Sequence, residues 1–205
     1  MTAASPAGPT RILLATGNAH KVDEVQAILS DGWVVEARDP GVEETGETFE
    51  ANALLKARAL AAATGEPAVA DDSGIEIDAL GGAPGIHSAR WTAEGDWIPR
   101  VLRELDGVPA TGRACRYVCA AAAVWPPGRG PAGRDEVVVR GTVEGVVADA
   151  PRGQGGFGYD PIVVPVEGDG RSFAEMTAGE KHDLSHRGRA FRALGRHLLA
   201  EPGEP

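Results

Sequence analysis

Ala68-Val69-Ala70-Asp71-Asp72-Ser73-Gly74 decides the fold prediction, because a short apolar run here leads directly into two adjacent carboxylates. The run is typical of a buried strand, and the polar residues after it are typical of the turn that ends a strand. In open α/β sheets, ligands bind beyond the carboxyl ends of the strands, so acidic residues there suit chemistry. Paired carboxylates are hard oxygen ligands that favour Mg²⁺, which usually binds together with substrate phosphates. A plain turn is the alternative, since Asp, Ser and Gly all favour turns.

The composition is that of a globular protein, with 42% hydrophobic and 24% charged residues among 205. We expect one domain over residues 11–200 behind a disordered tail, residues 1–10, which is small, polar and rich in proline. The net charge of -10 argues against a nucleic-acid partner or an anionic membrane surface. We find no apolar run long enough to span a bilayer, and the tail does not resemble a signal peptide. Cys115 and Cys119 lie too far apart on an extended strand to pair, so we expect buried thiols in a reducing cytoplasm.

A second polar stretch, Thr16-Gly17-Asn18-Ala19-His20-Lys21, lies between an apolar strand over residues 11–15 and an amphipathic helix. Backbone N–H groups and the helix dipole at such a junction favour a phosphate, and Lys21 adds a positive charge. The stretch matches neither of the common glycine-rich phosphate patterns, so a capped loop is the alternative. The next helix, residues 49–63, starts after Thr48 as N-cap and places Asn52 and Lys56 on one face. Lys56 becomes a site candidate only if that face points at the carboxylates.

The middle of the chain alternates strands and turns. Apolar or alternating patterns predict strands over residues 33–38, 75–80, 113–125, 136–147 and 162–166. Gly141 and Gly145 are expected to interrupt the fourth of these strands, and Ile98 to Leu105 is expected to be a short helix. Residues 126–134 are rich in proline, glycine and arginine and indicate a surface turn.

The last third holds another dense polar region. Glycines around Phe157 and Tyr159 permit a close approach to a ligand, and an aromatic ring can stack on a planar base; packing of these rings in the core is the alternative. A capping box, residues 177–180, begins a helix expected to carry Leu184 and Phe191 on one face. The first turns of this helix concentrate nitrogen donors that suit an anion: Lys181, His182, His186 and Arg187. A zinc site on the two histidines is the weaker alternative, because no clear third ligand follows.

The ordered set of motifs resembles the Ham1/RdgB family of non-standard purine nucleoside triphosphate pyrophosphatases, the inosine triphosphatase family. The motifs are Thr-Gly-Asn-x-x-Lys, Glu-Glu-Thr-Gly, Asp-Asp-Ser-Gly, Gly-Gly-Ala-Pro-Gly-Ile-x-Ser-Ala-Arg, Gly-Phe-Gly-Tyr-Asp-Pro and Glu-Lys-x-x-x-Ser-His-Arg-Gly. Each motif is weak by itself, but the set in this order is specific and covers nearly the whole chain. The resemblance implies an elongated mixed β-sheet flanked by helices, two lobes with a central active-site cleft, and a homodimer.

The resemblance also implies a reaction, the Mg²⁺-dependent hydrolysis of dITP, ITP and XTP to the monophosphate and pyrophosphate, which cleanses the nucleotide pool. It assigns Glu43 and Asp72 to Mg²⁺ and makes Asp72 the base for the attacking water, with Asp71 and Lys56 in support. The residues that it assigns to substrate binding are Thr16, Gly17, Asn18, Ala19, His20, Lys21, Ser73, Phe157, Gly158, Tyr159, Asp160, Lys181, His186 and Arg187.

Two alternatives and one departure accompany this resemblance. A Maf-like nucleotide pyrophosphatase and a catalytically inactive purine-nucleotide-binding regulator are the other functions considered. Members of the family commonly have Glu-Asn-Ala in the first long helix, whereas this chain has Ala51-Asn52-Ala53. The missing Glu would occupy the capping-box position, so we expect its loss to weaken the helix rather than catalysis.

Overall fold

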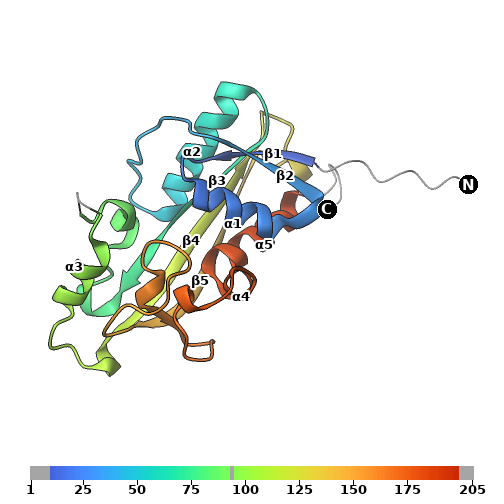
Figure 1. Cartoon of the computed structure of the whole chain (residues 1–205). Coiled ribbons are helices and arrows are strands. Elements are labelled where there is room, and N and C mark those ends of the chain that lie inside the picture. The colour runs from blue at the N-terminus through green and yellow to red at the C-terminus, as the bar shows by residue number, and fades with distance from the viewer. Residues whose placement is uncertain (1–9, 93–94, 199–205) are drawn as a thin grey trace, which may run out of the picture.

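The structure is a computed structural model that describes residues 10–92 and 95–198. The predicted N-terminal tail lies outside the described residues except for Thr10, which begins the first strand. The helices and strands, shown in Figure 1, are β1 (Thr10–Ala15), α1 (Ala19–Leu29), β2 (Trp33–Arg38), α2 (Phe49–Thr64), β3 (Ala68–Ile77), α3 (Trp97–Glu104), β4 (Ala114–Val124), β5 (Glu136–Val147), β6 (Val163–Pro165), α4 (Ala178–Leu184) and α5 (His186–Leu198).

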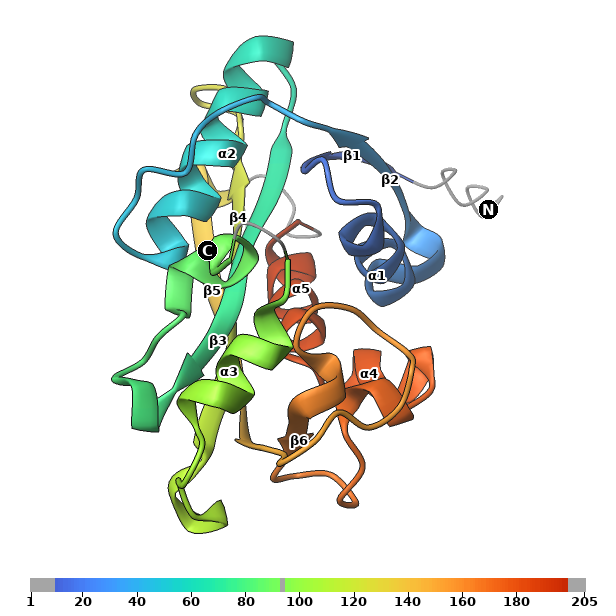
Figure 2. The same ribbon diagram turned by 60° about the vertical axis from the view of Figure 1, so that its left-hand side comes forward.

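One six-stranded sheet with the order β2-β1-β3-β4-β5-β6 organises the molecule. β2, β1 and β3 are parallel, and the remaining neighbours are antiparallel, so the predicted mixed α/β fold is confirmed. β1 pairs with the start of β3, at Ala68 and Val69, whereas β6 pairs with the far end of β5. The long strands β3, β4 and β5 therefore connect two lobes. Figure 2 shows β1, β2, α1 and α2 in the upper lobe and α3, β6 and α4 in the lower one.

Helices cover both faces of the upper part of the sheet. α2 packs Ala53, Ala57 and Leu60 on one face, and α1 and α5 pack Val25 and Phe191, among others, on the opposite face. The run Ala120–Ala123 on β4 alternates between these two cores, so its small side chains let helices approach the sheet from both sides. A third core fills the lower lobe, with α3 packed over β3, β4 and β5.

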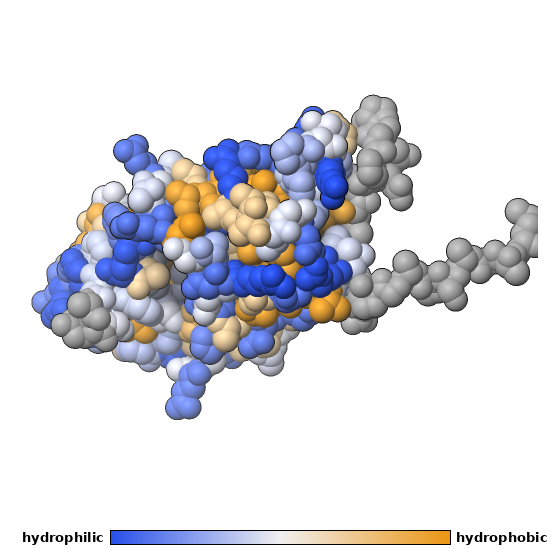
Figure 3. Space-filling view, turned by 90° about the horizontal axis from the view of Figure 1, so that it is seen from above, coloured by the Kyte–Doolittle hydropathy of each residue, from blue (hydrophilic) through white to orange (hydrophobic). Residues whose placement is uncertain are grey.

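Hydrophilic residues and smaller hydrophobic patches share the face seen in Figure 3. Among the described residues, the exposed large hydrophobic side chains are Val34 and Val166. No helix in residues 10–92 and 95–198 is long and apolar enough to cross a membrane. Cys115 and Cys119 are buried free thiols, as predicted.

β3 differs from its prediction, because it does not end before the two carboxylates. Asp71, Asp72 and Ser73 pair with Ala121, Ala120 and Cys119 of β4 in the middle of a continuous strand. The backbone hydrogen bonds of the long apolar β4 outweigh the turn preference of these residue types. The separate strand predicted over residues 75–80 is the second half of β3, which ends at Ile77 and leads into a 3₁₀ turn, Asp78–Leu80.

The predicted C-terminal helix is also divided, into α4 and α5. Ser185 between them is extended (φ -65°, ψ 156°), and its hydroxyl accepts a hydrogen bond from the Gly188 N–H. Ser185 thus ends one helix and caps the next, as serine commonly does. β5, in contrast, runs without interruption through Gly141 and Gly145. A Cβ at Gly141 would lie 2.2 Å from the His186 carbonyl oxygen, so the glycine allows α5 to pack closely on β5 instead of breaking the strand.

Candidate active site

The candidate site lies where β1 ends beside the middle of β3. β1 pairs with β3 only as far as Val69, so Asp72 to Gly74 are paired with β4 on one side and line a cavity. This inner cavity is also lined by Phe157, Tyr159 and other residues of the lower lobe. An outer cavity adjoins it and is lined by the β1–α1 loop, the loop before α2 and Arg90. The two cavities share lining residues, Asn18, Lys21, Glu44 and Ala89, and so form a continuous cleft between the lobes.

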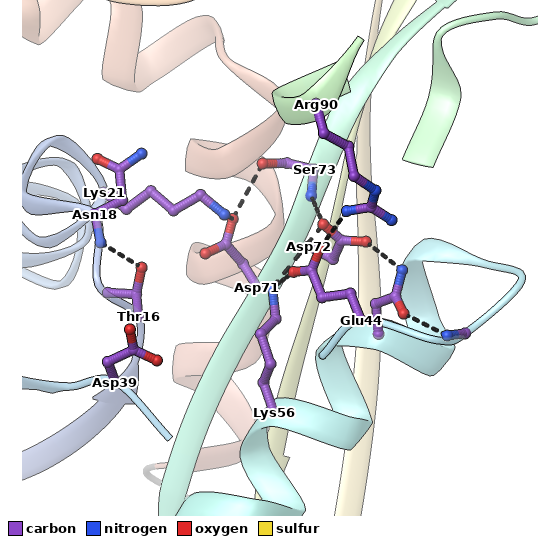
Figure 4. A network of polar contacts seen from close by, with 12 residues as sticks. Thr16, Asn18, Lys21, Asp39, Glu44, Lys56, Asp71, Asp72, Ser73 and Arg90 are labelled. Carbon is purple, nitrogen blue, oxygen red and sulfur yellow. Dashed lines mark hydrogen bonds and ion pairs between the residues drawn. The ribbon is translucent and has the colours of Figure 1, made fainter. Parts of the chain in front are cut away.

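The two adjacent carboxylates point to opposite faces of the sheet, as neighbouring residues of a strand must. Asp71 lies on the side of α1 and α5, where it contacts Lys21 and Arg187. Asp72 lies on the side of α2, where it contacts Asn52 and Lys56. Figure 4 shows this division around β3. Each carboxylate therefore has its own surroundings, on its own face of the sheet.

Asp71 is a buried anion surrounded by cations. Its Oδ2 lies 3.0 Å from Lys21 Nζ and 3.2 Å from Arg187 Nη2, and its side chain has no exposed surface. Burial would raise the pKa of Asp71, but the charges of Lys21, Arg187 and Lys56 outweigh it and hold the pKa well below its usual range. Asp71 is thus a permanent negative charge that orients Lys21 and Arg187.

Asp72 has a different balance of charges. Asn52 Nδ2 donates to Asp72 Oδ2 at 3.0 Å, the Ser73 N–H donates to Oδ1 at 2.9 Å, and Lys56 Nζ lies 4.0 Å away. The expected condition for Lys56 is met, since its face of α2 points at this carboxylate. Burial raises the pKa of Asp72 above its ordinary value; Lys56 opposes this, and the negative charge of Glu44 adds to it. A carboxylate with a raised pKa is better suited to accept a proton than Asp71.

The loop before α2 brings Glu44, which the sequence analysis did not assign, next to Asp72. Glu44 accepts hydrogen bonds from Lys56 and, at 2.9 Å, from Arg90 Nη1. Glu43, the predicted metal ligand, is exposed and lines the outer cavity. Asn52 ties this loop to the carboxylate, because its Oδ1 accepts from the Gly46 N–H at 2.7 Å while its amide donates to Asp72.

The predicted phosphate stretch is a strand-to-helix junction, as expected. Asn18 caps α1 by accepting from the His20 N–H at 3.0 Å, and Thr16 Oγ1 accepts from the Asn18 N–H at 3.1 Å. Gly17 and Asn18 line the outer cavity, Ala19 begins α1, and Lys21 extends to Asp71. The His20 ring stacks on Phe157 with 5.4 Å between ring centroids, which joins this junction to the glycine-rich loop of the lower lobe.

The inner cavity ends in a buried ionic cluster. Lys181 Nζ lies 2.6 Å from both Asp160 Oδ2 and Glu24 Oε1, and Arg187 pairs with Glu24 and donates to Ser73 Oγ at 2.8 Å. Asp160 also accepts from Tyr117 Oη and the Phe157 N–H. Glu24, on the buried face of α1, was not predicted, since a glutamate in an amphipathic helix usually faces solvent.

His186 and His182 do not form a zinc site. His186 is buried against Tyr117, with ring centroids 4.5 Å apart, and its pKa lies well below the ordinary value because of burial and the charges of Arg187 and Lys181. No cluster of three or more His, Cys, Asp or Glu residues placed to hold a metal occurs in the described part of the chain. His186 Nδ1 and Arg187 Nε are buried and have no hydrogen-bond partner among the described residues, so a ligand in the inner cavity would find unused polar atoms there.

The arrangement matches a known family. The Ham1 family model matches residues 12–197. The chain belongs to the Ham1 family. A Ham1 protein structure from Coxiella burnetii is 36% identical, with a TM-score of 0.77 over 92% of this chain and 98% of the other. A structure from Mycobacterium abscessus, described as a nucleoside-triphosphatase and dITP/XTP pyrophosphatase, is 42% identical, with a TM-score of 0.69 over 90% and 98% of the chains.

Two relatives of this Ham1 chain are described by the same activity. A dITP/XTP pyrophosphatase of Symbiobacterium thermophilum is 50% identical over 187 residues, which are 88% of this chain and 91% of that protein. A dITP/XTP pyrophosphatase of Streptomyces coelicolor is 49% identical over 197 residues, 90% of this chain and 95% of the other. The Ham1 fold expected from the sequence is thereby confirmed along nearly the full length of the chain.

Proposed function

We propose that this protein is a nucleoside triphosphate pyrophosphatase that hydrolyses dITP, ITP and XTP to the monophosphate and pyrophosphate, and so removes modified purine nucleotides from the nucleotide pool. The observation that carries the proposal is the position of Asp72, which lines the inner cavity beside Phe157 and Tyr159 and lies 4.0 Å from Lys56, a cation of the adjoining outer cavity. A nucleotide laid along this cleft would place its base by Phe157 and its phosphates by Lys21 and Lys56. The activity of relatives that are about half identical supports the same reaction.

Asp72 is the proposed general base. In the reaction, the oxygen of water forms a bond to phosphorus, the phosphoanhydride bond breaks, pyrophosphate leaves, and the water proton passes to the Asp72 carboxylate. Asn52 and Lys56 would hold this carboxylate in position. Lys21 would offset phosphate charge, and the junction from Thr16 to Lys21 would bind the triphosphate through backbone N–H groups. Asp71 would keep Lys21 and Arg187 aligned.

The residues around the inner cavity are proposed to bind the nucleoside. Phe157, Gly158, Tyr159 and Asp160 would hold the base and sugar, and Ser73 would contact the nucleotide. The keto group at position 6 of hypoxanthine or xanthine accepts hydrogen bonds, whereas the amino group of adenine donates them. Lys181, His186 and Arg187 would therefore favour the keto bases, because adenine would leave His186 Nδ1 and Arg187 Nε, which have no hydrogen-bond partner among the described residues, still unpaired.

Magnesium is the proposed cofactor, and the donor set fits it. Mg²⁺ is commonly held by one or two carboxylates together with substrate phosphates, so a cluster of three protein ligands is not needed. Asp72 and Glu43 would hold the ion, and a cation there would offset the burial and the negative charge of Glu44 that together raise the pKa of Asp72. Bound there, Mg²⁺ would supply charge neutralisation on the phosphate oxygens.

A homodimer and a cytoplasmic location complete the proposal. The homodimer is proposed because the resemblance to the family implies one. The substrates are intracellular nucleotides, and both described cysteines are free thiols, which agrees with a reducing compartment.

The test is pyrophosphate release from dITP, XTP, dGTP and dATP with Mg²⁺, with EDTA and with the Asp72→Asn variant. We expect rapid release from dITP and XTP, little from dATP, and none with EDTA or Asp72→Asn. Equal rates on all four nucleotides would refute the base selectivity assigned to Lys181, His186 and Arg187. Binding of ITP without any release would instead support the inactive regulator.

A further inference from the structure

His20 belongs to the predicted phosphate stretch, but its side chain takes part in a different contact. Asn18 and Lys21 line both cavities of the cleft, whereas His20 lines neither of the two. Its ring stacks instead on Phe157, with 5.4 Å between ring centroids and 15° between ring planes. We propose that His20 is a positioning residue, which holds the Phe157 ring as the platform for the purine base and links this platform to the phosphate stretch. This inference rests on the proposed function of the cleft.

Phe157 lies on a segment whose backbone is held more firmly than its ring. It stands between two glycines with left-handed backbone, Gly156 (φ 66°) and Gly158 (φ 63°), a conformation that glycine adopts without strain. The Phe157 N–H donates to Asp160 Oδ2 at 2.7 Å, which fixes the backbone of the loop. The Phe157 side chain is only half-buried, so packing in the core does not determine the direction of its ring. The stacked ring of His20 supplies that support.

His20 can support the ring because its own backbone is fixed. It lies in the first turn of α1, where Asn18 Oδ1 accepts from the His20 N–H at 3.0 Å. Val25 and Leu29 of the same helix are buried in the core of the upper lobe. His20 therefore projects from an anchored helix of the upper lobe, whereas Phe157 belongs to a loop of the lower lobe. The stack of the two rings is a contact between the lobes.

The position of this stack leaves room for a base. Phe157 lines the inner cavity and His20 does not, so His20 supports the Phe157 ring without filling the space of the ligand. Aromatic rings attract one another at centroid distances of about 4.5–7 Å, a range that includes the stack of His20 on Phe157. Lys21, the residue after His20, contacts Asp71 and lines both cavities. The stack would therefore fix the distance between the platform for the base and the groups that bind the phosphates.

The experiment compares the full-length wild type with His20→Ala, His20→Tyr and a matched control, His87→Ala. His87 is exposed, as His20 is, and also lines neither cavity. Calorimetry gives the Kd of dIMP, which contains the base, and of pyrophosphate, which does not; kinetics give kcat and KM for dITP. We expect His20→Ala to weaken dIMP binding and raise KM about twofold to tenfold, with kcat and pyrophosphate binding unchanged. His20→Tyr keeps an aromatic ring and should recover most of the loss, and His87→Ala should behave as the wild type does.

A double-mutant cycle tests whether His20 acts through Phe157. If it does, His20→Ala should have no further effect on the Kd of dIMP in a Phe157→Ala background. The same loss in both backgrounds, or an unchanged dIMP affinity in His20→Ala, would overturn the inference. An equal loss of dIMP and pyrophosphate binding would also overturn it, because His20 would then serve the phosphates directly. A wild-type protein that binds dIMP with the help of His20 but releases no pyrophosphate from dITP would refute the proposed function and leave this inference intact.

Discussion

Adjacent carboxylates on opposite faces of β3 lead to opposite predictions for the same substitution. Asp71→Asn removes a buried negative charge that Lys21 and Arg187 contact at 3.0 and 3.2 Å. Breaking a buried ion pair from one side typically costs about 3–5 kcal/mol, because the remaining charges stay buried without compensation. For a protein of this size, 1 kcal/mol corresponds to a change in Tm of roughly 2–4 °C. We therefore expect the Tm of Asp71→Asn to fall by about 6–20 °C.

Asp72→Asn should behave in the opposite way. The pKa of Asp72 is raised by burial and by Glu44, so at neutral pH its charged form is less stable in the folded protein than in the unfolded chain. A neutral side chain of the same shape removes this cost, and we expect an unchanged or higher Tm together with loss of pyrophosphate release. The variant would thus gain stability and lose activity, as is common when an active site holds an unfavourable charge.

The contributions of Asp71 and Asp72 to stability should depend on pH with opposite signs. The pKa of Asp71 is lowered in the folded state, so its stabilisation is present above the unfolded pKa, about 3.9, and is lost only as pH falls through the folded pKa. The pKa of Asp72 is raised in the folded state, so the increase in stability that Asp72→Asn brings at neutral pH should shrink as the pH falls to that pKa and below. Thermal unfolding of both variants across a pH series measures this. Equal Tm losses for the two variants at neutral pH would refute the assignment of their surroundings.

Three further predictions concern the groups around these carboxylates. The acidic limb of the pH profile of kcat/KM should report Asp72, and Asn52→Ala should move this limb to higher pH, because the Asn52 amide lowers the pKa of Asp72. A limb that stayed in place would remove Asn52 from this role. Ala51→Glu should complete a capping box with Thr48 and raise the free energy of unfolding by about 0.5–1 kcal/mol, measured by thermal unfolding. An unchanged stability would show that Glu50 already supplies the contact with the N-cap. Glu24→Gln should lower the free energy of unfolding by about 3–5 kcal/mol, because it leaves the buried charges of Lys181 and Arg187 with less compensation. The control Glu167→Gln removes an exposed ion pair with Arg189, and its stability should stay within about 0.5 kcal/mol of the wild type.

Local patterns predicted most elements of the fold. Residues 33–38 form β2 within the predicted limits, and α2 begins after its predicted N-cap, Thr48, whose hydroxyl accepts from the Ala51 N–H. These elements depend on spacing and capping that neighbouring residues decide among themselves. The break at Ser185 was missed because the apolar spacing of Leu184 and Phe191 fits one continuous helix, whereas the capping hydroxyl alone marks where the second helix begins.

The ion pairs within the site could not be predicted from the sequence. Glu44 and Arg90 are 46 residues apart, and Glu24 and Arg187 are 163 residues apart, so the fold alone brings each pair together. Considered separately, Glu24 in α1 and Arg90 at the end of a loop would both be interpreted as ordinary surface residues. Their charges are informative only after β3 is known to place α2 on one side and α5 on the other.

The pair Asp71-Asp72 shows why a motif can indicate a site and still leave its chemistry undecided. At the end of a strand, two carboxylates can turn toward one ion; within a strand, alternation separates them. The choice depends on whether β4 continues alongside, and that is decided by the pairing of Ala120 and Ala121 with residues about 50 positions earlier in the chain. Once the strand continues, the division of labour follows: the carboxylate facing Lys21 and Arg187 remains ionised and orients cations, and the carboxylate facing Asn52, Lys56 and Glu44 keeps the higher pKa that proton transfer requires.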